Sequence, residues 1–423
     1  MKVNQNNIQV ANHQANIMFI DMNSFFPSCE QQVNYWLRHR PIGVCVYTGK
    51  QGAVIALSKE AKKAGIKAAR IDEIMVRHPE FIPLETNPAR YREFHIKMMK
   101  VLKSFCDDVV PKSIDEAVLN FSNYRLMHKD LEKVAKDIKR KINQDVGDWF
   151  TCSIGIAPNA FLAKLASNLQ KPDGLVVINA DTIDSVLDKL KLTDLPGIAK
   201  NMALRLVDGG IHSPLQLRHT PPEVLRKVCK SVIGEHWHYR LNFMEVDIAT
   251  DDYKSMQAMR QISKEQRSSL QTLYDIHRAL CIQLEKRMVR HDLSGRHIGF
   301  SCSYEDGHGW SDHFHTAVPV QGGIELMNAL LLRIKLFEKE NDCEPIINQN
   351  ITRMTVWITD FVDTGFTQYA LYESTVRKDT LRKTVYNLKD KFGFEKIMHA
   401  AELTDTPVMK DVIGFGSIKD LTS

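Results

Sequence analysis

The sequence predicts an α+β protein built from several domains. At 423 residues the chain is too long for one ordinary hydrophobic core, and its length indicates roughly two to four domains. Short apolar strands alternate with amphipathic helices over residues 17–171 and again over residues 254–365, whereas residues 172–240 hold only short helices separated by Pro and Gly turns. The remaining segments are predicted to be an N-terminal tail, a linker and a C-terminal tail: residues 1–16, 241–253 and 366–423.

The first block begins with the apolar strand IMFIDM, residues 17–22. Two β-branched runs, 41–47 and 53–57, predict a hairpin. A helix is expected from Ser58 to Gly65, because Ser accepts from free N–H groups at a helix start and Gly tolerates the left-handed stop. The rest is predicted to be helix, hairpin, helix, strand and helix: residues 88–107, 109–121, 129–145, 150–157 and 159–170. This order favours one sheet with helices on one side.

The middle block is punctuated by LPGIAK, DGGIHSPLQL and TPPEVL, which predict tight turns between short helices. In the third block, strand and helix patterns alternate again. Its predicted elements are, in order, strand, helix, two strands, helix and strand: residues 259–266, 270–290, 297–304, 314–320, 322–340 and 351–361.

Composition excludes several classes of protein. No apolar run approaches the roughly 20 residues of a membrane span, and the polar segment MKVNQNNIQVANHQAN lacks the apolar core of a signal peptide. We therefore expect a cytoplasmic protein with no membrane partner. The eight cysteines are scattered singly from Cys29 to Cys343 without a CxxC pair, which indicates reduced thiols in the core. A net charge of +5 does not by itself indicate nucleic acid.

Three carboxylates interrupt apolar strand patterns. Asp21 lies inside IMFIDM, and Asp115 and Glu116 lie inside KSIDEAVLNF. A buried carboxylate needs a partner, and converging oxygen ligands are what Mg²⁺ requires. Neighbours in a regular strand point to opposite faces, so Asp115 and Glu116 share a site only if the chain bends there. The alternative is that they are turn or edge acids facing water.

Basic residues gather at several places. Two lysine clusters could neutralise a triphosphate, although each lysine could equally be a solubilising surface residue: Lys59, Lys62 and Lys63, and Lys164 and Lys171. Residues 254–300 hold nine Lys and Arg against four acids, which suits either a phosphate-tracking face or a solvated helix surface.

Residues 194–211 resemble a helix-hairpin-helix whose free N–H groups bind a DNA phosphate. Ala199 stands there in place of the usual second glycine, and an ordinary two-helix turn is the alternative. The histidines in EHWHY and GHGWSDHFHTA lack a zinc frame, so we expect them to be surface or satisfied residues.

Five motifs together resemble the Y-family translesion DNA polymerases: FIDMNSFFPSCE, GAVIALSKEAKKAGIK, KSIDEAVLNF, SIGIAPNAFLAKLASNLQKPDG and LPGIAK. The resemblance spans residues 17–365 and looks closest to the UmuC-like branch, the catalytic subunit of bacterial DNA polymerase V. It implies a right-hand polymerase with a palm and fingers (fingers about 32–88), a helical thumb with a helix-hairpin-helix, and a βαββαβ-like little finger.

The resemblance also implies roles for single residues. Asp21 and Asp115 would bridge two Mg²⁺ ions, Glu116 would bind the catalytic ion, and the Met22 carbonyl would complete the other. Phe26 falls at the aromatic steric gate that collides with a ribose 2′-OH, and Phe25 would lie under the incoming sugar or base. Lys62 and Lys171 would hold the triphosphate. Implied contacts to DNA come from the thumb hairpin and the basic stretch: Gly197, Ala199, Lys200, Lys264, Arg267, Arg287 and Arg290. Implied contacts to a sliding clamp are Gln368, Leu371 and Tyr372.

The expected activity is template-directed, error-prone synthesis from a DNA primer and dNTPs, in translesion synthesis and DNA repair. The implied partners are primer-template DNA, a sliding clamp and a UmuD-like subunit. A catalytically silent relative that binds DNA and recruits partners is the alternative. Chemistry alone also admits a two-metal nucleotidyl cyclase, which would need neither thumb nor little finger.

Overall fold

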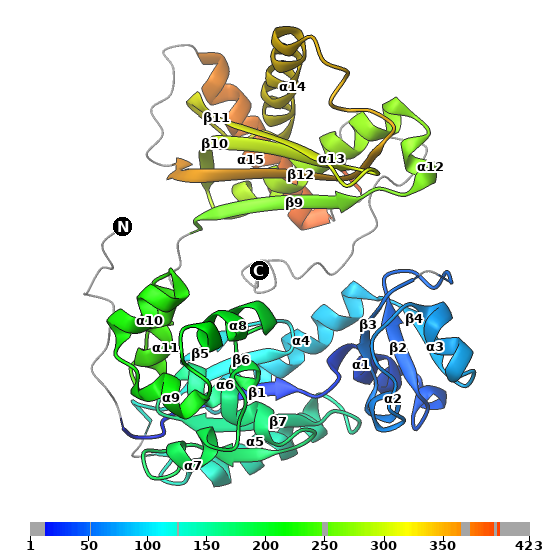
Figure 1. Ribbon diagram of the computed structural model, residues 1–423. Coiled ribbons are helices and arrows are strands. Elements are labelled where there is room, and N and C mark those ends of the chain that lie inside the picture. Colours follow the sequence, from blue (N-terminus) through cyan, green and yellow to red (C-terminus); the bar gives the residue numbers. More distant parts are fainter. Residues whose placement is uncertain are drawn as a thin grey trace. The chain divides into compact units, whose positions relative to one another are not determined.

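The computed structural model describes residues 13–364, apart from 51, 125–126 and 248–252, together with residues 373–392 and 396–397. These residues fall into two compact units that divide at the linker near residue 250 (Figure 1). Each unit has hydrophobic cores of its own. None of the described helices is both long and apolar enough to cross a membrane.

A five-stranded sheet forms the centre of the first unit, with the strand order β5-β6-β1-β7-β8. Its strands are β5 (Val109–Pro111), β6 (Glu116–Asn120), β1 (Ile17–Met22), β7 (Cys152–Ala157) and β8 (Leu175–Val177). The central strand β1 pairs antiparallel with both β6 and β7. The predicted hairpin of residues 109–121 is confirmed as the antiparallel pair β5–β6.

Helices cover both faces of this sheet, so the expectation of helices on one side is wrong. Met18 and Ile20 of β1 lie in the core formed with α1 (Phe25–Val33), α4 (Pro88–Lys103) and α5 (Leu131–Asp145), whereas Phe19 lies in the core formed with α6 (Ala160–Leu169). Successive side chains of a strand point to opposite faces, and in β1 both sets are apolar. The strand therefore needs cover on both sides.

Helix α6 packs unusually close to β7. A Cβ atom at Gly155 would lie 2.0 Å from the carbonyl oxygen of Ala163, so a side chain at this strand position would push the helix away. The close approach brings α6 and the turn that follows it to the sheet face on which Phe19 lies.

A small second sheet in the same unit has its own core and the order β3-β2-β4. Its elements are β2 (Ile42–Cys45), β3 (Val54–Leu57), α2 (Lys59–Lys63), α3 (Ile71–Arg77) and β4 (Ile82–Glu85), and the 3-10 turn η2 (Tyr35–Leu37) leads into it. The antiparallel β2–β3 pair confirms the predicted hairpin. Helix α2 starts as predicted, because the Ser58 hydroxyl accepts a hydrogen bond from the Ala61 N–H at 3.1 Å.

Short helices complete the first unit. They are α7 (Ile183–Leu187), the 3-10 turn η3 (Leu192–Asp194), α8 (Lys200–Asp208), α9 (Pro214–His219), α10 (Pro222–Cys229) and α11 (Ile233–Leu241). Their buried side chains, including Trp237, form one core with those of α6. The short helices are therefore attached to the central sheet through α6.

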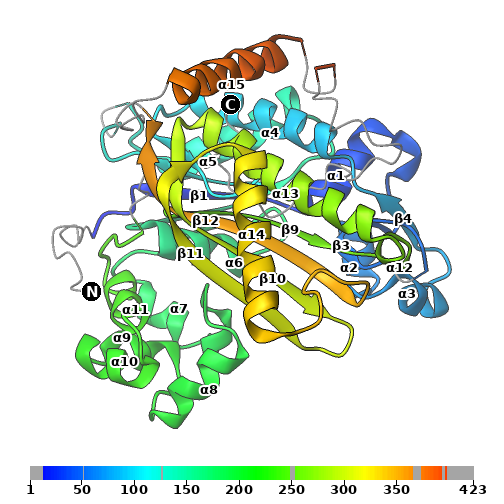
Figure 2. The same ribbon diagram turned by 90° about the horizontal axis from the view of Figure 1, so that it is seen from above.

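The second unit is a four-stranded antiparallel sheet with the order β11-β10-β12-β9. Its elements are β9 (Ser255–Gln261), α12 (Lys264–Arg267), α13 (Leu270–Arg290), β10 (Leu293–Tyr304), β11 (Gly309–Val320), α14 (Gly323–Asn341), β12 (Ile351–Asp363) and α15 (Glu373–Phe392). Helices α13 and α14 lie along one face (Figure 2), where Ile298, Phe300 and Val356 are buried. The predicted βαββαβ order is confirmed.

Asn23 joins the end of β1 to two neighbouring segments. Its Nδ2 donates to Ser153 Oγ at 3.0 Å, and its Oδ1 accepts from Thr151 Oγ1 at 3.2 Å and from the Asp173 N–H at 2.8 Å. Its own N–H donates to the Thr151 carbonyl at 2.8 Å. One buried amide thus fixes the turn that contains Lys171 against the sheet.

Replacing Asn23 with Ala is expected to lower the free energy of unfolding of the first unit by about 1–3 kcal/mol, because buried donors and acceptors lose their partners. Urea unfolding followed by circular dichroism measures the change. Asn34→Ala is the matched control, since Asn34 is exposed and caps only η2. Equal losses in the two variants would contradict the role given to Asn23.

Candidate functional site

Asp21 and Glu116 lie directly opposite each other across the β1–β6 ladder. Asp21 lies two positions after Phe19, and Glu116 lies two positions before Val118, so each acid shares a sheet face with that apolar residue. Phe19 and Val118 both belong to the core beside α6. The two carboxylates therefore lie on the same face of the sheet. Both are mostly buried, with side-chain exposures of 12% for Asp21 and 18% for Glu116.

Asp115 precedes β6, in a bend of residues 113–115. Its carbonyl accepts a hydrogen bond from the Met22 N–H at 2.9 Å, and its carboxylate accepts one from the Ser113 hydroxyl. Because the bend releases Asp115 from strand alternation, it can act on the same side as its neighbour Glu116.

The three acids are close enough to affect one another's protonation. Burial raises the pKa of the Asp115 carboxyl, and the negative charge of Asp21 raises it further. Burial also raises the pKa of Glu116, against the opposing effect of Lys164. The structure thus brings together Asp21, Asp115 and Glu116, which are separated by about a hundred residues in the sequence.

Two lysines neutralise this face. Lys171 Nζ lies 2.5 Å from Asp21 Oδ2, and Lys164 Nζ lies 3.0 Å from each carboxylate oxygen of Glu116. The ammonium groups come from α6 and from the turn after it, which the close packing on β7 brings to the acids. Both side chains remain more than a third exposed.

Lys62 reaches the same site from α2. Its Nζ donates to Ser24 Oγ at 3.0 Å, where Ser24 has a left-handed φ of 50°. Burial lowers the pKa of Lys62, and the nearby positive charge of Lys171 lowers it further. Lys59, by contrast, donates to the Trp149 carbonyl at 3.3 Å and so connects α2 to the segment that precedes β7.

The donor set suits a hard divalent cation. Carboxylate oxygens are the ligands that Mg²⁺ prefers, and here two ammonium groups stand where cations would balance the charge. Among the described side chains, no three His, Cys, Asp or Glu residues are already arranged to hold a metal ion. Binding a cation therefore requires Lys164 and Lys171 to release the carboxylates.

The two phenylalanines after the strand differ in exposure. Phe26 is half-buried and stacks on Tyr91, with ring centroids 4.6 Å apart and an interplanar angle of 25°. Phe25 is only 3% exposed and packs in the core near Phe150. Phe26 is therefore the ring available to a ligand, and Phe25 supports it from the core.

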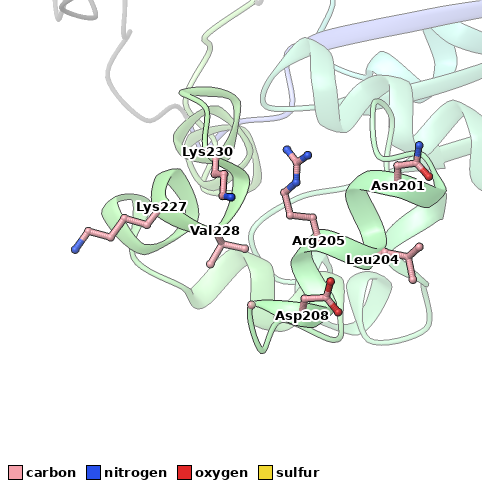
Figure 3. A pocket seen from close by; sticks show the side chains of 8 residues that line it. Asn201, Leu204, Arg205, Asp208, Lys227, Val228 and Lys230 are labelled. Carbon is pink, nitrogen blue, oxygen red and sulfur yellow. The ribbon is translucent and has the colours of Figure 1, made fainter.

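The predicted hairpin lies on the surface before α8. Gly197 has φ +87°, a conformation that favours glycine, and Gly197, Ala199 and Lys200 are all exposed. No side chain caps the start of α8. Beside it, a shallow pocket between α8 and α10 is lined by the basic residues Arg205, Lys227 and Lys230, and Figure 3 shows Arg205 extending toward the segment of Lys230.

The four basic residues predicted in the second unit have different surroundings. Lys264 is exposed, and Arg290 is half-exposed in the last turn of α13. Arg287 donates to the Gln257 carbonyl at 3.0 Å. Arg267 is 8% exposed and pairs with Glu305 at 2.7 Å, so its predicted contact with DNA is not supported. The predicted clamp residues, Gln368, Leu371 and Tyr372, lie outside the described residues.

Sequence reasoning missed several supporting residues. Ser24 accepts a hydrogen bond from Lys62, and Tyr91 stacks on Phe26. Lys164 pairs with Glu116, whereas the sequence suggested that it could neutralise a phosphate. No local sequence signal marks Tyr91, because it lies 65 positions from Phe26 and meets it only through the packing of α4 on α1.

Residues 20–168 match the model of the impB/mucB/samB family. A DNA polymerase IV from Streptococcus pyogenes serotype M12 (strain MGAS2096) is 35% identical over 213 residues, which cover 49% of this chain and 58% of the relative. A DNA polymerase IV from Pelotomaculum thermopropionicum is 31% identical over 248 residues, which cover 58% and 60%. The chain thus spans about three fifths of the length of these relatives.

The curated relatives do not support the expected closeness to the UmuC-like branch, since they are named DNA polymerase IV. The expectation of a UmuD-like subunit rested on the resemblance to the UmuC-like branch, so it is not supported either.

Two solved structures share the fold. A Y-family DNA polymerase chimera of Dbh and Dpo4 has a TM-score of 0.69 at 22% identity, covering 82% of this chain and 99% of that one. An insertion ternary complex of Dbh DNA polymerase has a TM-score of 0.58 at 21% identity, with the same coverage. The predicted fold class is confirmed. The chain has the fold of the Y-family DNA polymerases, and its residues 20–168 are similar to the impB/mucB/samB family.

Proposed function

We propose that this protein is a template-directed DNA polymerase that adds deoxynucleotides to a primer 3′ end. The observation that carries the proposal is the convergence of Asp21, Asp115 and Glu116 on one sheet face beside Lys171 and Lys62. The curated relatives are named DNA polymerase IV, which supports the same activity. We assign the palm and fingers to residues 17–177, with the fingers at about 32–88, because β8 is a strand of the central sheet and shifts the boundary predicted at residue 171. The thumb then consists of α7–α11, residues 183–241, and the little finger of residues 254–365.

The three acids are the residues that would hold two Mg²⁺ ions, together with the Met22 carbonyl. When bound, such ions lower the pKa of the attacking hydroxyl and offset the charge on the leaving phosphate oxygen. The chain itself contributes buried carboxylates on a rigid ladder, which keeps their positions fixed during nucleotidyl transfer.

The lysines have a second role in this proposal. Lys171 and Lys164 balance the acids in the free protein, and their ammonium groups become available for a triphosphate once cations take their place. Lys62 approaches from the opposite element, α2, and its partly desolvated ammonium forms strong charge-assisted hydrogen bonds with phosphate oxygens. A triphosphate is therefore bound between fingers and palm.

DNA is bound by the thumb and the little finger. The exposed residues Gly197, Ala199 and Lys200, with the basic pocket beside α8, suit phosphate oxygens. Lys264, Arg287 and Arg290 add positive charge in the little finger. We place the activity in error-prone translesion synthesis, because the fold is that of the Y-family DNA polymerases. A sliding clamp as a further partner remains a prediction.

Replacing Asp115 with Asn is expected to reduce primer extension at least about a hundredfold, because the site loses a cation ligand while its shape is kept. Gel analysis of a labelled primer on a defined template measures extension, and DNA affinity measured alongside should stay unchanged. Asp137→Asn, on the exposed face of α5, is the matched control.

Three results would contradict the proposal. Wild-type protein that binds DNA without extending it would indicate a catalytically silent relative, and products that ignore the template would indicate another nucleotidyl transfer. Full extension by Asp115→Asn would remove this carboxylate from the site.

Phe26→Ala is expected to raise ribonucleotide incorporation about tenfold or more, because the half-buried ring no longer blocks a 2′-OH. Tyr91→Ala should raise it by a smaller factor, since it removes only the ring on which Phe26 stacks. Competition between matched dNTP and rNTP measures the ratio. Tyr35→Ala, which removes an exposed ring elsewhere, is the control. An unchanged ratio in Phe26→Ala would exclude the gate.

A further inference from the structure

Three histidines form a cluster on the open face of the little-finger sheet. His297 lies on β10, and His313 and His315 lie on the neighbouring strand β11. His297 is directly opposite His315 in the ladder. All three alternate with residues of the helix-covered face, such as Ile298 and Phe314, and so point away from α13 and α14.

The rings are in direct contact. His297 Nε2 lies 3.0 Å from His313 Nδ1, at hydrogen-bond distance, and the His297 and His315 rings are stacked with centroids 4.3 Å apart and an interplanar angle of 9°. His297 Nδ1 also lies 3.0 Å from Thr359 Oγ1 on β12. No three metal-ligating side chains among the described residues are arranged to hold an ion, so the cluster is a hydrogen-bonded group.

This arrangement couples protonation to anion binding. A hydrogen bond between two imidazoles needs one N–H and one bare nitrogen, so full protonation of both rings would set two N–H groups against each other. Burial lowers the pKa of His297, and the charges of His315 and His313 lower it further, whereas Asp360 on β12 raises it. An anion placed over the rings would remove that repulsion and favour the charged forms.

The surrounding face is suited to a polyanion. Its outward positions hold hydroxyl, amide, aromatic and basic side chains and one exposed methionine: Ser255, Gln257, Met259, Gln261, Ser301, Ser303, Ser311, Arg353, Thr355, Trp357 and Thr359. The acid Asp312 points to the helix side, where it pairs with Arg333 of α14 at 2.8 Å. Charged groups next to the cluster are Arg296 on β10 and Asp360, which has a left-handed φ of 55°. Hydroxyl and imidazole N–H groups donate to phosphate oxygens, and the positive charge of Arg296 offsets the repulsion that Asp360 exerts on an anion.

We propose that this cluster is a proton-dependent contact for the phosphates of bound DNA, so that the protein takes up protons when DNA occupies the open face of the little-finger sheet. The inference rests on the proposed function, because it assumes that DNA is the anion. A bound phosphate raises the pKa of His297 above its value in the free protein. Between the pKa in the free protein and the higher pKa in the complex, the complex holds more protons than the free protein. DNA affinity therefore increases as the pH falls through this range.

The test is the affinity of the full chain for primer-template DNA, measured by fluorescence anisotropy from about pH 8 to about pH 6 at constant salt. Wild-type affinity is expected to rise about tenfold or more over this range, corresponding to an average uptake of at least about half a proton on binding. His297→Gln, which removes the ring that contacts both others, should reduce the rise to less than about threefold. His308→Gln, on the exposed β10–β11 turn, is the matched control and should behave as wild type.

The outcomes separate the two proposals. Absence of DNA binding by wild type at every pH would overturn the proposed function. DNA binding with the same pH dependence in wild type and His297→Gln would overturn only the histidine contact. The double variant His313→Gln/His315→Gln keeps the measurement decisive if His297→Gln alters the sheet, and it should show the same reduced rise. Calorimetry in two buffers of different ionisation enthalpy counts the protons directly, and an equal count in wild type and variants would also reject the contact.

Discussion

Two carboxylates, Asp21 and Glu116, face each other across the β1–β6 ladder. Several contacts in the first unit offset the electrostatic repulsion between them. Like charges at directly opposed positions destabilise a sheet, and burial increases the cost. The ladder nevertheless holds Asp21 and Glu116 in register, and Lys164 and Lys171 offset their charge from above the face. These lysines are in place because α6 packs on β7 at Gly155, and because Asn23 fixes the turn after α6.

The same interactions are compatible with the proposed cation site in a stable free protein. In the absence of metal, the ammonium groups compensate the acids, and the unit keeps its charge balance. In the proposed function, a divalent cation competes with these groups for the carboxylates. Since the lysine side chains are more than a third exposed, they can turn toward a bound triphosphate without opening the core. The acids themselves need only small side-chain movements, because the strand pairing determines their backbone positions.

Local signals in the sequence predicted most elements and the acids of the site. Caps, turns and periodicity located the β2–β3 hairpin, helix α13 and the βαββαβ order of the second unit, because these features depend on neighbours in the chain. The three acids were recognisable because a carboxylate in an apolar strand is rare. The bend at Asp115, on which their convergence depends, was an open question from sequence, and the structure supplies it.

What sequence reasoning missed depends on packing between distant segments. Helices on both faces of the sheet follow from apolar residues on both sides of β1, but which distant helix covers which face depends on packing that the sequence does not show. The sequence predicted Arg267 to be a surface charge, but the residue is buried and pairs with Glu305. The different exposure of Phe25 and Phe26 also depends on the core that surrounds Phe25. The histidine cluster arises from strand register, which brings His297 opposite His315.

The central claim is that Asp21, Asp115 and Glu116 exchange their lysine partners for divalent cations when substrate binds. The most direct measurement is a crystal structure of the protein with primer-template DNA, a non-hydrolysable dNTP and Mn²⁺, with the ions located by anomalous scattering. We predict anomalous peaks among the three carboxylates, with the Lys171 and Lys164 ammonium groups moved away from Asp21 and Glu116. Peaks at other positions, or lysines that still pair with these acids while nucleotide is bound, would contradict the account.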